Sequence, residues 1–148
     1  MSYTNLNYHI VFATKERRPF LTDDLHTRLA EYIGGVVRSL KGKLVESGGQ
    51  DDHIHLAVSA SPQTAPADLL RNIKANSSRW IHETFTDQRR FGWQDGYAAF
   101  SVSHSAMPDV IRYIQRQAEH HSRMTFDQEL KALLERHGIE FDPKYLMG

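Results

Sequence analysis

The chain has 148 residues, with 18 acidic and 18 basic side chains and no cysteine. The length suits a single domain over residues 1–148. The lack of thiols excludes disulfide scaffolds, cysteine-bound zinc and cysteine nucleophiles. A formal charge of zero argues against binding polyanions through overall charge, so any nucleic-acid contact must use local basic clusters.

Hydropathy gives no sign of a membrane protein. No stretch approaches the roughly 20 apolar residues of a membrane span, and the N-terminus opens directly into an alternating pattern. We therefore expect a soluble, cytoplasmic protein.

The spacing of apolar residues predicts a series of strands and helices. In chain order they are a strand over 3–14, a helix over 23–41, strands over 44–48 and 53–58, a helix over 65–85, a strand over 97–102, and helices over 108–121 and 125–137. Thr22 or Asp23 can cap the first helix, and Pro108 suits the first turn of the third. Residues 49–52 have the composition of a hairpin turn.

The order of the first six elements predicts the fold class. Strand, helix, strand, strand, helix, strand is the ferredoxin-like arrangement, an α+β fold in which helices pack on one face of an antiparallel sheet. The two helices after residue 108 are additions to this unit.

Two histidines lie two residues apart in the strand predicted over 53–58. Because side chains alternate along a strand, His53 and His55 point to one face and their apolar neighbours to the other. Paired imidazoles suit a divalent ion such as Mg²⁺, Mn²⁺ or Zn²⁺, although an exposed polar face gives the same pattern. Asp51 and Asp52 are either plain turn residues or partners that orient the imidazoles.

The helix predicted over 108–121 carries Tyr113 and Gln117 four residues apart, so the two share a face. That face lies about a quarter to a third of a turn from the apolar stripe. The stripe contains Met107, Ile111, Ile114 and Ala118. A packing role is the usual alternative for a tyrosine, but this position indicates that Tyr113 flanks the core. His121 continues the polar face.

Together these side chains favour phosphoryl transfer to a tyrosine. A phenol with a pKa near ~10 is a weak nucleophile until charge in the reaction is stabilised. A divalent ion held by His53, His55 and Gln117 would neutralise charge on the phosphate under attack. A phosphotyrosine product keeps the energy of the cleaved phosphodiester, so the same site can reseal DNA without ATP.

The chain resembles, nearly end to end, the His-hydrophobe-His single-tyrosine transposases of small bacterial and archaeal insertion sequences. The segments that carry the resemblance are 8–12, 15–19, 52–56, 76–80, 93–97, 100–103 and 113–117, with His120 and His121. The resemblance implies a ferredoxin-like fold and a transposase that cuts single-stranded DNA at element ends, forms a 5′-phosphotyrosine and rejoins the strands.

Carried over residue by residue, the resemblance implies Tyr113 as the nucleophile and His53, His55 and Gln117 as metal ligands, with Mg²⁺ or Mn²⁺ expected. It implies single-stranded DNA with hairpin ends as the partner. It also implies a homodimer in which the tyrosine helix serves its own or the partner's histidines, with a mobile segment over 103–108.

Basic residues form local clusters that are candidates for DNA contact. They are Lys15, Arg17 and Arg18 after the first strand and Arg71, Lys74 and Arg79 in the second helix. Acidic residues gather in the tail, at Asp127, Glu129, Glu135, Glu140 and Asp142. Solvated surface is an equal alternative for any one cluster. Trp80 and Trp93 could stack on bases, but a core role is favoured.

Two other functions fit part of the pattern. One is a non-catalytic protein that binds DNA hairpins and derives from such a transposase, which the intact set of four site residues argues against. The other is a histidine-dependent phosphodiesterase, which needs no tyrosine and normally a second histidine motif. The other histidines of this chain do not repeat the pattern.

Overall fold

A computed structural model describes residues 1–118, 123–144 and 146. It confirms the predicted α+β class. The four strands are β1 (Leu6–Ala13), β2 (Lys43–Gln50), β3 (His53–Ala60) and β4 (Ala98–Val102). They form an antiparallel sheet in the order β2-β3-β1-β4, so β1 and β3 are the inner strands.

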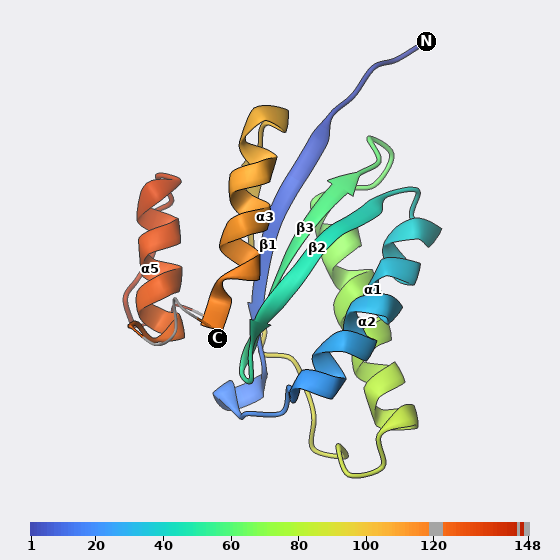
Figure 1. Ribbon diagram of the computed structural model, residues 1–148, viewed down its shortest axis with the longest axis vertical. Coiled ribbons are helices and arrows are strands. Elements are labelled where there is room, and N and C mark those ends of the chain that lie inside the picture. Colours follow the sequence, from blue (N-terminus) through green and yellow to red (C-terminus); the bar gives the residue numbers. More distant parts are fainter. Residues whose placement is uncertain (119–122, 145, 147–148) are drawn as a thin grey trace.

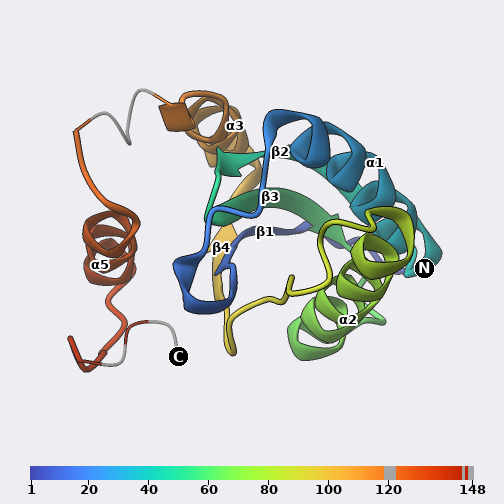
Figure 2. The ribbon, with the colours of Figure 1, turned by 90° about the horizontal axis from the view of Figure 1, so that it is seen from below.

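Helices cover both faces of this sheet. The helices α1 (Asp23–Ser39) and α2 (Pro66–Thr84) lie side by side on one face (Figure 1). The helices α3 (Met107–Gln115) and α5 (Phe126–Arg136) lie on the other (Figure 2). Two short 3-10 helices, η1 (Lys15–Arg17) and η2 (His104–Ala106), follow β1 and β4. The first six main elements therefore form the predicted ferredoxin-like unit, and α3 and α5 close its second face.

The core explains why the sequence takes these elements. Apolar residues of α1 and α2 recur every three or four positions and are buried against the strands. Those with at most 2% exposure are Leu25, Leu29, Ile33, Val37, Leu69, Leu70, Ile73 and Ile81. The inner strands are buried on both faces along most of their length, so several of their polar side chains lie out of solvent.

Helix caps fix the starts of two helices. The Thr22 hydroxyl accepts a hydrogen bond from the Leu25 N–H at 3.2 Å, as predicted for α1. Thr125 and Gln128 form a reciprocal capping box that begins α5.

The helix predicted over 108–121 is interrupted. It ends as α3 at Gln115, because Arg116 leaves helical geometry with φ −101° and ψ 22°. The Arg116 N–H then bonds to the carbonyls of Arg112 and Tyr113. Gln117 and Ala118 are helical again. Residues 119–122, with His120 and His121, lie outside the described residues.

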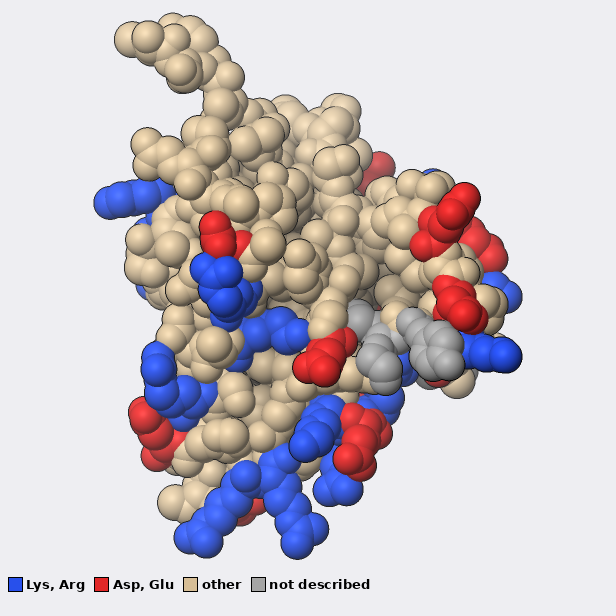
Figure 3. Space-filling view, turned by 180° about the vertical axis from the view of Figure 1, so that it is seen from behind, with Lys and Arg blue, Asp and Glu red and all other residues tan. Residues whose placement is uncertain are grey.

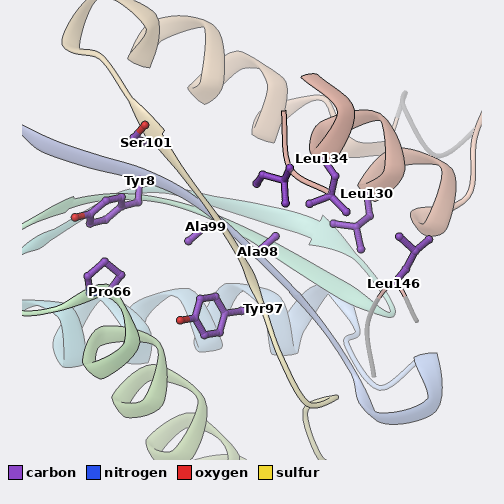
Figure 4. A pocket seen from close by; sticks show the side chains of 10 residues that line it. Tyr8, Pro66, Tyr97, Ala98, Ala99, Ser101, Leu130, Leu134 and Leu146 are labelled. Atoms are coloured by element: carbon purple, nitrogen blue, oxygen red, sulfur yellow. The ribbon is translucent and has the colours of Figure 1, made fainter. Parts of the chain in front are cut away.

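Two further features bear on function. Among the described residues, no helix is both long and apolar enough to cross a membrane. A hollow of about 550 Å³ lies between the β4 side of the sheet and α5 (Figure 4). It is lined mainly by apolar side chains such as Tyr97, Leu130 and Leu134, and contains none of the predicted site residues.

Candidate metal and nucleophile site

The histidine pair lies at the start of β3, an inner strand of the sheet. In the register of β3 with β1, His53 lies opposite Ala13 and His55 opposite Val11. Both histidines are fully buried, at 0% exposure. The alternative of an exposed polar strand face is therefore wrong, and α3 and α5 cover the pair.

The Nδ1 atom of each imidazole, called here the outer nitrogen, has its own partner, and Nε2 is the inner nitrogen. His53 Nδ1 lies 2.7 Å from Asp52 Oδ1, so Asp52 has the orienting position that was one of its two predicted roles. His55 Nδ1 lies 2.8 Å from His9 Nε2, a contact not foreseen from sequence. Fixing the outer nitrogens aims both Nε2 atoms away from the turn and toward α3 and α5.

The inner nitrogens meet Gln117 and Glu129. His53 Nε2 lies 3.0 Å from Gln117 Oε1 and 3.4 Å from Glu129 Oε1. His55 Nε2 lies 3.1 Å from the same Glu129 oxygen. The Gln117 amide N–H donates to Glu129 Oε2 at 2.9 Å, which leaves its oxygen facing His53. Two imidazole nitrogens, an amide oxygen and a carboxylate oxygen thus converge.

Tyr113 reaches the same cluster from the last turn of α3. Its side chain is half-buried, and its hydroxyl donates a hydrogen bond to Glu129 Oε2. Its ring centroid lies 5.8 Å from that of His55. The structure therefore brings together all four residues selected for the chemistry, Tyr113, Gln117, His53 and His55, within one chain.

Glu129 is the group that sequence reasoning missed. It was counted among the acids of the tail, yet it is 1% exposed. The capping box at Thr125 begins α5, and Glu129 lies on the buried face of that helix. The other buried positions of the face are Phe126, Leu130, Leu133 and Leu134. An acid within an apolar helix stripe was the available signal, because a buried carboxylate needs partners.

The donor set fits a divalent ion. His53, His55 and Glu129 offer ligand atoms that all lie within 4.8 Å of one another. With ligand bonds of roughly 2.1 Å, neighbouring donor atoms of one ion lie about 3.0 to 3.4 Å apart. The contacts of 3.0, 3.1 and 3.4 Å among the inner atoms have this spacing. The mix of nitrogen and oxygen donors suits a hard or borderline ion.

Burial and mutual contact shift the pKa values of these groups. Burial and the Glu129 carboxylate raise the pKa of Tyr113 well above its ordinary value. The pKa of Glu129 is held far below its ordinary value, because hydrogen bonds from His53 and His55 outweigh its burial. Burial opposes the charged form of His53, yet Asp52 and Glu129 raise its pKa to about 9. Burial and the nearby His55 lower the pKa of His9 to about 3.

The candidate DNA-contacting residues have different surroundings. Arg17 pairs with Asp127 at 2.7 Å and stacks over Phe126, which ties η1 to α5. Lys74 donates to the backbone carbonyls of Gln94 and Gly96 at 2.8 and 2.7 Å. The exposed arginines of α2 have polar neighbours on their own helix, Arg71 with Asp68 and Arg79 with Asn76.

Lys15 and Arg18 lie on a mainly basic surface, where Arg18 also pairs with Glu16 at 3.1 Å. They line a shallow hollow together with Arg89 and Arg90, which precede Phe91 in the loop after α2. Lysine and arginine side chains gather at this end of the molecule (Figure 3). The two tryptophans are partly buried against the core. Trp80 stacks on Tyr32, and Trp93 donates to the Ser77 hydroxyl.

Comparison with solved structures defines the class of protein. The chain superposes with a TM-score of 0.65 on a Deinococcus radiodurans R1 protein described as a candidate transposase, at 25% identity, covering 78% of this chain and 93% of that one. A REP-associated tyrosine transposase bound to a REP hairpin gives a TM-score of 0.62 at 15% identity, covering 84% and 73%. The fold is thus one that tyrosine transposases use.

Sequence comparison gives the family. The family model for IS200-like transposases matches residues 2–117, so the chain belongs to the IS200-like transposase family and is a DNA-cutting enzyme of that class. The ISDra2 transposase TnpA of Deinococcus radiodurans is 24% identical over 117 residues, 76% of this chain and 84% of that protein. The IS200 transposase of Salmonella typhimurium is 27% identical over 124 residues, 78% of each. The family match ends at Gln117, before α5 and Glu129.

Proposed function

We propose that this protein is a metal-dependent transposase that cuts and rejoins single-stranded DNA through a 5′-phosphotyrosine on Tyr113. The observation that carries the proposal is the meeting of four groups at one carboxylate. The Tyr113 hydroxyl, the Gln117 amide and the inner nitrogens of His53 and His55 all contact Glu129.

The reaction uses these groups in defined roles. The Tyr113 oxygen attacks the phosphorus, the bond from phosphorus to the 3′ oxygen breaks, the phenol loses its proton and the departing oxygen gains one. Rejoining is the reverse, in which a 3′-hydroxyl attacks the phosphotyrosine and releases the phenol. The hydrogen bond from Tyr113 to Glu129 fixes the position of the attacking oxygen before DNA binds.

His53, His55 and Gln117 are the proposed metal ligands, and Glu129 is added to them because its Oε1 contacts both histidines. Mg²⁺ or Mn²⁺ fits this mix of donors. A bound ion would stabilise negative charge that develops on the phosphate oxygens. The buried surroundings strengthen that interaction, since few waters compete for the charge.

The proposed substrate is single-stranded DNA with hairpin ends. A hairpin is what the REP-associated structural neighbour binds, and this supports a similar partner here. We place phosphate contacts on the basic surface of Lys15, Arg18, Arg89 and Arg90. Of the other candidates, Arg71 and Arg79 are exposed enough to reach DNA, whereas Arg17 and Lys74 hold loops in place.

We also propose that residues 1–148 act as one catalytic domain that forms a homodimer. The single domain is supported by α5, which lies beyond the family match yet contributes Glu129 to the site. The homodimer rests on the family resemblance alone.

The deciding experiment is a covalent-adduct assay. Wild-type protein with Mn²⁺ and single-stranded oligonucleotides from the ends of its element is expected to give an SDS-resistant protein–DNA adduct. Tyr113→Phe should give none, and Tyr97→Phe, an exposed tyrosine outside the site, should match the wild type. An adduct formed by Tyr113→Phe would reject the nucleophile. Hairpin binding with no cleavage by the wild type would favour the non-catalytic alternative, and a free 5′-phosphate would favour a phosphodiesterase.

A further inference from the structure

His9 lies on the sheet beside His55 and packs against Tyr113 of α3. It is in the middle of β1, an inner strand, and is 4% exposed. Val11 pairs with His55 in the register, so His9, two residues earlier, shares the face of His55 and is its diagonal neighbour. The adjacent Tyr8 and Ile10 point to the opposite face. His9 is therefore directed into the layer that contains the proposed chemistry.

The contact between the two rings is specific. His9 Nε2 lies 2.8 Å from His55 Nδ1, a distance typical of a hydrogen bond. The ring centroids are 5.1 Å apart with an angle of 29° between the planes. The edge of His9 also packs against Tyr113 and Phe100, at centroid distances of 5.8 and 5.9 Å. One buried side chain thus contacts both a proposed ligand and the proposed nucleophile.

The arrangement matches that of the other ligand. His53 is held at Nδ1 by Asp52, and His55 is held at Nδ1 by His9. An imidazole that binds a metal through Nε2 carries its proton on Nδ1, and a partner at Nδ1 fixes both the proton and the ring orientation. A neutral imidazole can accept that proton through Nε2 while its own proton stays on Nδ1.

We infer that His9 is a positioning residue whose hydrogen bond to His55 Nδ1 holds the His55 ring in the orientation that presents Nε2 to the metal. The inference rests on the proposed metal site. The bond also keeps the two stacked rings beside Tyr113, so His9 sets the distance between ligand and nucleophile. It does not touch the reacting phosphate, and its effect passes through His55.

Metal affinity tests the inference. His9→Phe keeps an aromatic ring of similar size but removes the acceptor, and His9→Gln keeps an acceptor that can reach His55. By calorimetry, His9→Phe should bind Mn²⁺ about 10- to 100-fold more weakly, the usual loss when a ligand's partner is removed. His9→Gln should recover most of that loss. His82→Phe, which removes a histidine that contacts the Phe91 carbonyl, should bind as the wild type does. Wild-type affinity in a folded His9→Phe protein would overturn the inference.

A spectroscopic measurement on the wild type covers the case in which His9→Phe does not fold. In metal-free protein labelled with ¹⁵N at histidine, a scalar coupling across the hydrogen bond should join His9 Nε2 to His55 Nδ1. Packing without a hydrogen bond gives no such coupling, so its absence would overturn the inference.

The adduct assay separates this result from the proposed function. Suppose that the wild type binds Mn²⁺ but forms no adduct, and that His9→Phe binds Mn²⁺ more weakly. Strand transfer would then be rejected and the positioning role of His9 retained. If the wild type forms the adduct and His9→Phe binds Mn²⁺ as well as the wild type does, strand transfer would be retained and the role of His9 rejected.

Discussion

At the scale of single residues, the buried carboxylate of Glu129 contacts every other group of the proposed site. The two oxygens of Glu129 have separate partners. Oε1 contacts His53 and His55, whereas Oε2 accepts from Tyr113 and Gln117. A carboxylate this deep in a protein is stable only when such partners surround it. Glu129 therefore couples the proposed ligands on the sheet to the nucleophile on α3.

Replacing Glu129 by glutamine tests that coupling. Glu129→Gln keeps the size and one acceptor but removes the charge. Because Glu129 is a proposed ligand, Mn²⁺ affinity should fall by at least the roughly tenfold that is typical when a partner of a ligand is lost. Adduct yield should fall with it. Titration calorimetry and the adduct assay are the measurements, with Glu135→Gln as the exposed control on the same helix. Unchanged Mn²⁺ affinity would mean that the histidines and Gln117 bind the ion without Glu129.

The shifted pKa values predict how stability of the metal-free protein depends on pH. The pKa of His53 is raised from 6.5 to about 9, so its stabilising contribution is complete below about pH 6.5 and is lost as pH rises through 9. The pKa of His9 is lowered from 6.5 to about 3. Below pH 6.5 this imidazole is protonated in the unfolded chain but stays neutral in the folded one. The free energy of unfolding therefore also falls as pH drops below 6.5.

Thermal melts in EDTA from pH 4 to 10 should therefore have a maximum near pH 6.5. Asp52→Asn removes one of the groups that raise the pKa of His53, and it should move the alkaline loss to lower pH. A Tm that stays constant from pH 6.5 to 9.5 in the wild type would contradict the raised pKa.

At the scale of elements, the position of Tyr113 depends on close packing between α3 and β2. A Cβ added at Gly48 would lie 2.7 Å from the Ile114 carbonyl oxygen and 2.9 Å from Ile114 Cγ2. The first contact is with backbone, so α3 must move as a unit. Ile114 is the neighbour of Tyr113, and the displacement reaches the nucleophile directly.

Gly48→Ala should accordingly lower both stability and adduct yield. Overpacking of this kind costs about 1–3 kcal/mol, measured by urea unfolding. Gly35→Ala in α1 is the matched control, because its Cβ would meet only the end of the Arg38 side chain, at 3.7 Å. Alanine also favours a helix over glycine, so this control should be neutral or stabilising by up to about 1 kcal/mol. Equal loss in the two variants would exclude a specific role for Gly48.

The break in the third predicted helix shows what periodicity cannot reveal. Residue 116 is an arginine, neither glycine nor proline, so the local sequence does not indicate that α3 ends there. A continuous helix already placed Tyr113 and Gln117 on one face. Beyond the break, Gln117 is 2% exposed and its oxygen lies at His53. Such tertiary adjustments are invisible in an amphipathic pattern.

At the scale of the whole molecule, the sequence predicts the fold better than the site. The βαββαβ order follows from alternation and helical spacing, both of which are local. His53, His55, Tyr113 and Gln117 were selected by pattern and resemblance, and they lie together. His9 and Glu129 were not selected, because their roles come from strand register and from the packing of α5. An acid within an apolar helix stripe was the signal for Glu129. His9 shares its strand face with Asn7, so the sequence pattern gives no such signal for it.

The last prediction concerns which chain supplies the tyrosine. The family resemblance allows Tyr113 to act on the histidines of either subunit, and the proposed mobility of residues 103–108 remains a prediction. In the structure, the hydroxyl of Tyr113 and the histidines contact the same Glu129 of one chain. A mixture of Tyr113→Phe with the double variant His53→Ala and His55→Ala should therefore form no more adduct than either protein alone. If the mixture regains adduct, the tyrosine acts across the subunits, and size-exclusion chromatography with light scattering should then show a dimer.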